Sequence, residues 1–331
     1  MSNREFDRVL VTGGTGFIGS LVLERLIRKG IRPLVTTRSP GKSHYFGSSD
    51  VNLYELDITD SVRTNELIRS YKPQAVLHLA GVTGSGDPIG DLCDKVNLTA
   101  TQSIFTSLDE VGVEKVVTIG SAAEYGLQPL PFREEMKMRP ISKYGTSKAA
   151  ATRMALGMHA DNGFPVSVLR VSSAYGIGQP RHMFLPQVIE HALAKRQFEM
   201  SHGKQLRDFV HVSDVAEAII AALNTKEAVG KIINIGSGKG SALRDVAKKV
   251  WSMCEAEPDR LLIGARPTIN DDDIDTEADI SRAEDILGWR PQIPFIEHSG
   301  ETGGLAAMVA RVRSELKNSI AAEPCQAEAL R

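Results

Sequence analysis

The sequence of 331 residues contains few cysteines, few aromatic residues and no long hydrophobic run. Its three cysteines, Cys93, Cys254 and Cys325, lie too far apart to predict a disulfide framework or a zinc-binding pair, and we expect no metal site. Because no run of about eighteen apolar residues occurs, we expect no membrane-spanning segment. The first residues lack the apolar core and cleavage site of a signal peptide, so we expect a cytoplasmic protein.

The sequence also lacks a large excess of positive or negative charge. The chain carries 39 Lys and Arg against 41 Asp and Glu, a formal net charge of -2, which provides no general attraction to nucleic acid or to an acidic membrane. Hydrophobic residues make up 42% and charged residues 24%, the balance of an ordinary globular protein. We therefore expect a globular protein with a sizeable core and a small-molecule partner.

The first half of the chain alternates between two hydrophobic periods. Short apolar runs at residues 9–12, 33–37, 51–56, 75–80, 115–121 and 166–172 predict buried strands. Amphipathic stretches at residues 17–30, 61–71 and 91–111, and another from about Tyr144, predict helices between them. This rhythm predicts an α/β fold, a doubly wound parallel sheet of the Rossmann type.

The rhythm loosens after residue 170, which suggests a second part of the molecule. We predict a dinucleotide-binding domain at residues 1–170, completed by residues 206–236. Residues 171–205 and 237–319 should form a smaller C-terminal substrate-binding lobe over the strand ends, where ligands bind in such sheets. Residues 320–331 carry no motif, and we expect a disordered tail there.

A glycine-rich turn, GGTGFIG, lies at residues 13–19 between the first predicted strand and the first predicted helix. Glycines there allow a tight turn and let backbone amides approach a pyrophosphate at the helix N-terminus. In this position the pattern predicts a dinucleotide site, whereas elsewhere it would indicate only a tight turn. The expected contacts are Gly13, Gly16, Phe17, Ile18 and Gly19.

The end of the second predicted strand bears on the choice of cofactor. An acidic residue there would bind the adenosine ribose hydroxyls and favour NAD. The chain has Thr-Thr-Arg-Ser at residues 36–39 instead. Arg38 can pair with a ribose 2′-phosphate, so we predict NADP, with NAD as the alternative if Arg38 is only a surface residue.

Tyr144 and Lys148 lie four residues apart and should share one face of a helix. A lysine cation beside a phenol stabilises the phenolate and should lower its pKa from about 10. The tyrosine can then exchange a proton with a sugar oxygen. Ser121, at the end of a predicted strand, can polarise the same oxygen. The alternative is an exposed pair without a catalytic role.

Taken together, the motifs resemble those of the extended short-chain dehydrogenase/reductase family of sugar-nucleotide epimerases, dehydratases and reductases. The segments that carry this resemblance, in family order, are VTGGTGFIG, LDITD, HLAG, KVNLTAT, GSAAEYG, YGTSK, LRVSSAYG, LRDFVHVSD, INIGSG and LGWRP. They extend from about residue 8 to residue 291. The resemblance implies a Rossmann-type domain, a nucleotide-sugar substrate and a catalytic triad matched by Ser121, Tyr144 and Lys148.

The resemblance also implies roles around the triad. Cofactor binding is implied for the glycine turn, for Arg38 and for the tyrosine and lysine of the triad. It is also implied for Asp57 and Ile58 at the adenine and for Leu79, Ala80 and Gly81 at the nicotinamide. Asn97 is implied to bind the cofactor as well and to support the triad. Residues implied to bind substrate are Thr83, Ala122, Ser173, His182, Arg207 and Arg266. Of these, Arg207 in LRDF is expected to grip the diphosphate, with Arg266 as a second such arginine or a surface residue.

Departures from the family pattern narrow the chemistry. The acidic pair of the dehydratases is replaced by Ala122 and Ala123, so we do not expect dehydration. The epimerising reductases have a cysteine where this chain has Ala123, so His182 is expected to be a substrate-loop residue. Ser173 stands where an asparagine is usual, which should rearrange one polar contact.

We therefore expect an NADPH-dependent 4-ketoreductase of a nucleotide-linked 4-keto-6-deoxyhexose. A nucleotide-sugar 4-epimerase of the UDP-glucose/galactose type is the alternative, because the same triad serves both reactions. A non-catalytic redox-sensing protein ranks third. We also expect a homodimer through the helices at residues 91–111 and from Tyr144. Ala151, Met154, Ala155 and Met158 would form the contact unless they face the sheet.

Overall fold

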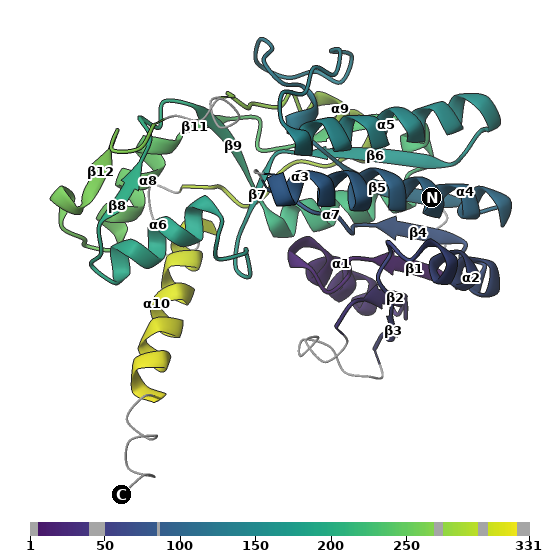
Figure 1. Cartoon of the computed structure of the whole chain (residues 1–331), viewed down its shortest axis with the longest axis horizontal. Helices are drawn as coiled ribbons and strands as arrows, with labels where there is room; N and C mark the ends of the chain where they lie inside the picture. Colours follow the sequence, from purple (N-terminus) through teal and green to yellow (C-terminus); the bar gives the residue numbers. More distant parts are fainter. Residues whose placement is uncertain (1–5, 40–49, 85–86, 268–273, 297–303, 323–331) are drawn as a thin grey trace, which may run out of the picture.

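The computed structural model describes residues 6–39, 50–84, 87–267, 274–296 and 304–322. Seven parallel strands form the central sheet in the order β10-β6-β5-β4-β1-β2-β3, which confirms the predicted Rossmann-type fold (Figure 1). The strands are β1 (Val9–Thr12), β2 (Leu34–Thr37), β3 (Asn52–Glu55), β4 (Ala75–His78), β5 (Lys115–Ser121), β6 (Val166–Val171) and β10 (Ile232–Ile235).

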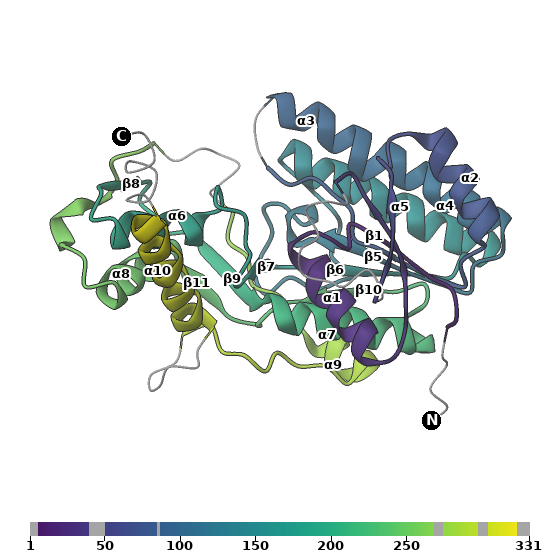
Figure 2. The ribbon, with the colours of Figure 1, turned by 90° about the horizontal axis from the view of Figure 1, so that it is seen from below.

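Helices cover both faces of this sheet (Figure 2). One face carries α2 (Ser61–Tyr71), α3 (Asp87–Cys93), the π-helical segment η2 (Asp94–Ala100), α4 (Thr101–Glu110) and α5 (Lys143–Asn162). The other face carries α1 (Phe17–Arg28), α7 (Val212–Asn224) and α9 (Ser281–Leu287). Because both faces are covered, the strands are apolar on both sides, as in their continuous Val- and Leu-rich runs.

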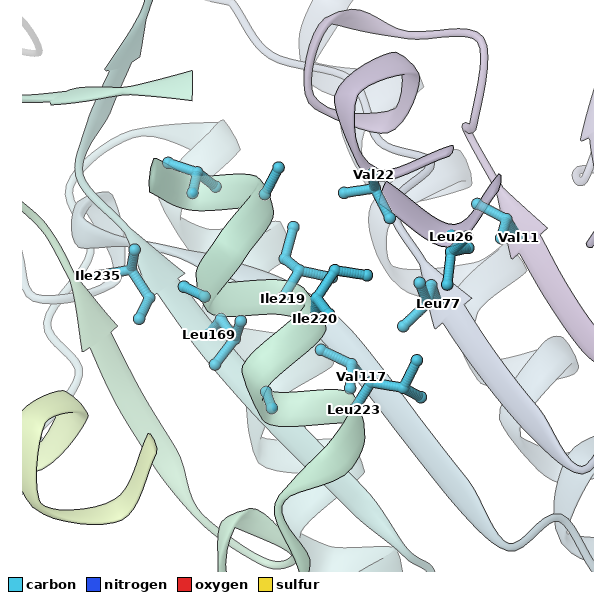
Figure 3. Close-up of a cluster of buried hydrophobic side chains, with 14 of the residues drawn as sticks. Val11, Val22, Leu26, Leu77, Val117, Leu169, Ile219, Ile220, Leu223 and Ile235 are labelled. Atoms are coloured by element: carbon cyan, nitrogen blue, oxygen red, sulfur yellow. The ribbon is translucent and has the colours of Figure 1, made fainter. Parts of the chain in front are cut away.

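The larger core lies beneath α7. Figure 3 shows Ile219 and Leu223 of this helix directed at the sheet, where Val117 and Leu169 lie. All four side chains are at most 3% exposed. The apolar face of α7 therefore packs the segment that follows β9 of the smaller lobe against the central sheet.

The smaller lobe adjoins the carboxyl ends of the strands. It contains the three-stranded sheet β11-β9-β7, built from β7 (Ser173–Tyr175), β9 (Leu206–His211) and β11 (Gly240–Ala242), and the pair β8 (Phe198–Met200) and β12 (Leu261–Ile263). Its helices are α6 (Phe184–Leu193), α8 (Leu243–Met253) and α10 (Gly304–Ala322). Two single 3-10 turns follow α7 and α8 along the chain: η4 (Lys226–Ala228) and η5 (Pro258–Arg260). A separate core holds the lobe together around Phe198, Val250 and Trp251.

Two predicted boundaries need correction. Helix α9 falls within residues 237–319, predicted for the smaller lobe, but it packs on α7 and β10 because Ala283 and Trp289 join the core of the larger domain. Helix α10 extends to Ala322, so residues 320–322 are helical rather than part of a tail, and residues 323–331 lie outside the described residues. The other domain bounds stay a prediction. No helix in the described part of the chain is both long and apolar enough to cross a membrane.

Part of the apolar patch expected at a dimer contact faces the protein's own core. Ala155 is fully buried, and Met154 and Met158 pack on the same cluster as Val116 and Val166 of the sheet. These strands need an apolar cover, and α5 provides it. Ala155 therefore belongs to the core, whereas Ala151, Met154 and Met158 keep part of their surface exposed, and the homodimer through this patch stays a prediction.

Replacing Ile219 with alanine should test the importance of α7. The change leaves a cavity against the sheet and should lower the free energy of unfolding by about 2–5 kcal/mol, measured by urea denaturation. Val62→Ala on α2, where the valine is 66% exposed, serves as the control and should change it by less than about 0.5 kcal/mol. Similar losses for both variants would show that α7 does not anchor the sheet.

Candidate active site

The turn between β1 and α1 has the shape that a dinucleotide requires. Gly13 adopts a positive φ of 70°, and a Cβ there would lie 2.5 Å from the backbone nitrogen of Ala80. A Cβ on Gly19 would overlap the carbonyl oxygen of Gly13. Helix α1 begins at Phe17 without a side-chain cap and without an acidic residue in its first turn. Its first amides are thus available to a pyrophosphate, and the predicted residues fit this ligand.

The adenosine end of this site lies at the tips of β2 and β3. The hydroxyls of Thr15 and Thr37 are 3.1 Å apart and tie the glycine turn to β2. Arg38 is exposed just beyond, and Asp57 is exposed next to the buried Ile58. Hydrogen bonds from Thr59 and, to a smaller extent, the positive charge of Arg38 lower the pKa of Asp57. The positive charge of Arg38 and the negative charge of Asp57 therefore interact with each other at this end of the site.

The residues predicted to line the nicotinamide lie where β4 ends. A Cβ on Gly81 would lie 3.2 Å from Oδ1 of Asn97 and 3.3 Å from Nζ of Lys148. Asn97, in the π-helical segment η2, accepts a hydrogen bond from the amide of Val82 and donates one to the hydroxyl of Ser147. Asn97 therefore links the loop after β4 to the helix that carries Lys148.

A buried histidine supports the residues that precede Gly81. The ring of His78 lies between the hydroxyls of Thr12 and Thr101, at 2.8 and 2.9 Å. Burial lowers the pKa of His78 to about 3, so the ring is neutral. Thr12 also accepts a hydrogen bond from the amide of Ala80, while the side chain of Leu79 packs on the core under α1. His78 thus supports this loop without adding a charge to it.

The three predicted triad residues come together at the ends of β5 and α5. The hydroxyl of Ser121 lies close enough to the phenol of Tyr144 to lower its pKa. Nζ of Lys148 donates to the carbonyl oxygen of Ile119 at 2.9 Å, next to Gly81. The hydroxyl of Ser142 caps α5, so the helix begins at the point that presents Tyr144 to Ser121. The alternative of an exposed pair is wrong, because Lys148 is only 9% exposed.

The expected low pKa of the phenol is not found. Burial raises the pKa of Tyr144 to about 12, and the hydroxyl of Ser121 offsets only part of this effect. Glu124 and Cys93 raise it further. Burial also lowers the pKa of Lys148, which weakens the cation that was expected to stabilise the phenolate. Tyr144 is therefore protonated at neutral pH and suited to donate a proton.

A buried ion pair, absent from the sequence prediction, lies behind the triad. Glu124 ends the single turn η3 (Ala122–Glu124) and is fully buried, with Arg170 of β6 only 1% exposed. Oε2 of Glu124 lies 2.7 Å from Nε of Arg170. Oε1 accepts from the amide of Ser121 at 2.8 Å and from the hydroxyl of Thr152 at 3.1 Å. The Ser-x-x-Glu spacing in GSAAEYG is that of a capping box and was the available signal.

The predicted diphosphate-binding residue lies on β9. The guanidinium of Arg207 donates to the carbonyl oxygens of Leu206 and Ile274. Ile274 joins a small apolar cluster with Ala122, which directly follows Ser121. Arg207 therefore lies beside the segment that borders the triad, and Ser173 lies on the neighbouring strand β7.

Other predicted substrate contacts are spread around the smaller lobe and its border. Arg266 lies 3.7 Å from Glu199 of β8, and both side chains are at least half exposed. His182 is exposed in the loop before α6, and Thr83 is exposed after β4. The ion pair with Glu199 favours the surface interpretation of Arg266. Within the described residues, no group of three or more His, Cys, Asp or Glu could hold a metal ion.

Comparison with known proteins identifies the family. The model of the NAD dependent epimerase/dehydratase family matches residues 9–236. The chain belongs to this family. The match covers the glycine turn, the triad and β10, and it confirms the resemblance inferred from the motifs.

Relatives align over nearly the whole chain. UDP-glucose 4-epimerase of Rhizobium leguminosarum bv. trifolii is 29% identical over 316 residues, covering 88% of this chain and 94% of the relative. UDP-glucose 4-epimerase of Azospirillum brasilense is 30% identical, covering 86% and 87%. The structure of MoeE5 in complex with UDP-glucose and NAD is 28% identical, has a TM-score of 0.81 and covers 93% of this chain and 99% of its own. The chain is therefore an enzyme, and these relatives support the predicted epimerase alternative better than the ketoreductase.

The Tyr144→Phe variant should abolish turnover and keep dinucleotide binding nearly intact. The ring stays in place, but the transferable proton is lost, which costs ~10²–10⁴-fold in rate. Steady-state rates and dinucleotide titration measure the two effects. Tyr71→Phe is the matched control, because the Tyr71 hydroxyl bonds only weakly, at 3.4 Å, to the carbonyl of Val9 at the opposite end of the sheet. Near-normal turnover of the Tyr144 variant would overturn its assignment.

Proposed function

We propose that the enzyme is a nucleotide-sugar 4-epimerase with a Ser-Tyr-Lys triad. The observation that carries this proposal is the assembled triad with Ala122 and Ala123 beside it. Dehydration needs an acid and a base at neighbouring sugar carbons, and alanines supply neither. Relatives that share the full length include 4-epimerases of UDP-glucose, UDP-glucuronate and dTDP-L-rhamnose, which supports 4-epimerisation as the shared reaction.

The side chains divide the reaction between them. When bound, the dinucleotide supplies a nicotinamide that accepts a hydride from the sugar and returns it. Tyr144 moves a proton at the C4 oxygen, and the hydroxyl of Ser121 hydrogen-bonds the same oxygen. Lys148, close to Gly81, keeps a cation at the nicotinamide end. Arg207 would bind the diphosphate as the sugar turns, since a guanidinium forks onto phosphate oxygens.

A 4-ketoreductase that consumes NADPH remains the second candidate. It is favoured by the end of β2, where Thr37 and the exposed Arg38 replace the acidic residue that binds the ribose hydroxyls. Two observations argue against the reductase. Asp57 interacts electrostatically with Arg38 and would place a negative charge near a 2′-phosphate. The similar MoeE5 structure contains NAD. The complete triad argues against a redox-sensing protein. A homodimer and a cytoplasmic location stay predictions.

Cofactor retention and substrate conversion together distinguish the candidates. The purified protein is denatured, and the released dinucleotide is identified by chromatography. The native protein is then incubated with UDP-glucose, UDP-galactose and other nucleotide sugars without added cofactor. Retained NAD and interconversion of a C4 pair support the epimerase. Stoichiometric consumption of NADPH with a 4-keto sugar nucleotide, without such interconversion, would replace it by the reductase.

Arg38→Asp should change dinucleotide preference. If Arg38 holds a 2′-phosphate, the variant loses a charge-assisted hydrogen bond worth about 1.5–3 kcal/mol, and NADP affinity falls roughly ten- to a hundred-fold while NAD affinity does not fall. Fluorescence titration with both dinucleotides measures this. Lys29→Asp makes the same charge change at the far end of α1 and should leave both affinities unchanged. Unaltered NADP binding in the Arg38 variant would show that Arg38 is a surface residue only.

A further inference from the structure

Three elements of the active site meet at one carboxylate. Glu124 accepts from the backbone of Ser121 at the end of β5, from Thr152 on α5 and from Arg170 on β6. Thr152 lies on the helix that carries Tyr144 and Lys148, two turns after the tyrosine. The carboxylate is therefore a direct connection between the strand that presents the serine and the helix that presents the tyrosine, in addition to the hydrogen bond from Lys148 to Ile119.

We propose that Glu124, held by Arg170, is a positioning residue that keeps the hydroxyl of Ser121 and the phenol of Tyr144 aimed at one substrate oxygen. Glu124 reaches the reacting atoms only through these two residues, so it is not itself catalytic. The inference rests on the proposed role of the triad, but it holds equally for epimerisation and for ketone reduction.

The surroundings of the pair argue that it serves geometry rather than stability. Removing two charges from water is costly, and a buried ion pair is often no more stable than an apolar replacement. Nη1 and Nη2 of Arg170 have no hydrogen-bond partner among the described residues, and the guanidinium lies over the ring of Tyr125 instead, 4.5 Å from its centre. A Cβ on Gly120 would lie 2.6 Å from Oε1 of Glu124, so the strand is shaped around the carboxylate.

The charge of Glu124 also acts on the triad. The ionisable groups that influence the phenol of Tyr144 are Glu124 from η3 and Cys93 from α3, while Lys148 lies one turn along its own helix. The negative charge of Glu124 disfavours the phenolate and so raises the pKa of Tyr144. It also helps to keep Lys148 protonated against the effect of burial. Neutralising Glu124 should therefore make Tyr144 ionise at lower pH.

The central test removes both charges together. Glu124→Gln alone leaves Arg170 buried without a counter-charge and is expected to destabilise the fold. The double variant Glu124→Gln with Arg170→Met avoids this problem. Its kcat should fall roughly ten- to a hundred-fold, because misplaced catalytic groups lose that much, while KM for the nucleotide sugar stays within about twofold. Unchanged kcat and an unchanged pH profile would overturn the proposal.

A milder variant tests the same connection without touching the charges. Thr152→Val removes only the hydroxyl that donates to Glu124 and should lower kcat several-fold, whereas Thr152→Ser restores that donor and should recover the wild-type rate. Thr64→Val on α2 removes an equally buried hydroxyl, bonded to the carbonyl of Asp60, and is the matched control. If Thr152→Ser is as slow as Thr152→Val, packing rather than the hydrogen bond is responsible, and the proposal fails.

A readout without turnover separates this inference from the proposed function. Ionisation of Tyr144 is followed by ultraviolet difference absorbance, with the same protein carrying Tyr144→Phe as the reference, over the pH range in which circular dichroism shows an intact fold. In the double variant of Glu124 and Arg170, ionisation should begin at a lower pH than in the wild type. An unshifted onset refutes the electrostatic role of Glu124. Absence of any sugar-nucleotide turnover in the wild type would instead refute the proposed function.

Discussion

The hydrogen bond from the backbone of Ser121 to the buried carboxylate of Glu124 determines how the other catalytic parts are arranged. It closes a single turn immediately after β5, so the strand ends with its hydroxyl at the sheet edge instead of continuing into a loop. The same carboxylate engages α5 and β6. Because β4, β5 and β6 are parallel neighbours, their carboxyl ends share one edge, where the glycine turn and Lys148 also lie. The cofactor site and the triad are therefore parts of one rigid edge.

Local patterns in the sequence were sufficient for the fold and for naming the residues that the fold brings together at the candidate site. The strand-turn-helix context of GGTGFIG and the four-residue spacing of Tyr144 and Lys148 depend on chain neighbours, and a short window of sequence contains them. The predicted strands at residues 75–80 and 115–121 coincide with β4 and β5 for the same reason. Where a structural or functional feature depends on residues that are close in sequence, the hydrophobic periodicity and the turn-forming residues predict that feature.

Features that depend on contacts between segments far apart in sequence could not be predicted from such local patterns. Arg170 lies in an apolar strand sequence, and only the folded sheet shows that Glu124, 46 residues earlier, neutralises it. The apolar residues of α5 have helical spacing whether they face a partner or the sheet, and only the fold shows that Ala155 and the partly exposed Met154 and Met158 pack on the cluster of Val116. Helix α9 was placed in the wrong lobe because its packing on α7 joins segments that are far apart in sequence. The high pKa of Tyr144 has the same origin, since burial raises it more than the hydroxyl of Ser121 lowers it.

A 4-epimerase and a 4-ketoreductase make different demands on this phenol. A 4-epimerase needs Tyr144 to accept a proton in one half of its cycle and to return it in the other, whereas a reductase needs only donation. Tyr144, Ser121 and Lys148 are required in both cases, so the triad motif cannot separate them. What differs is the balance of charge around the phenol. Burial and, to a smaller extent, the charge of Glu124 favour the neutral form, which suits donation. Accepting a proton in the oxidative half is therefore the step that burial and Glu124 disfavour.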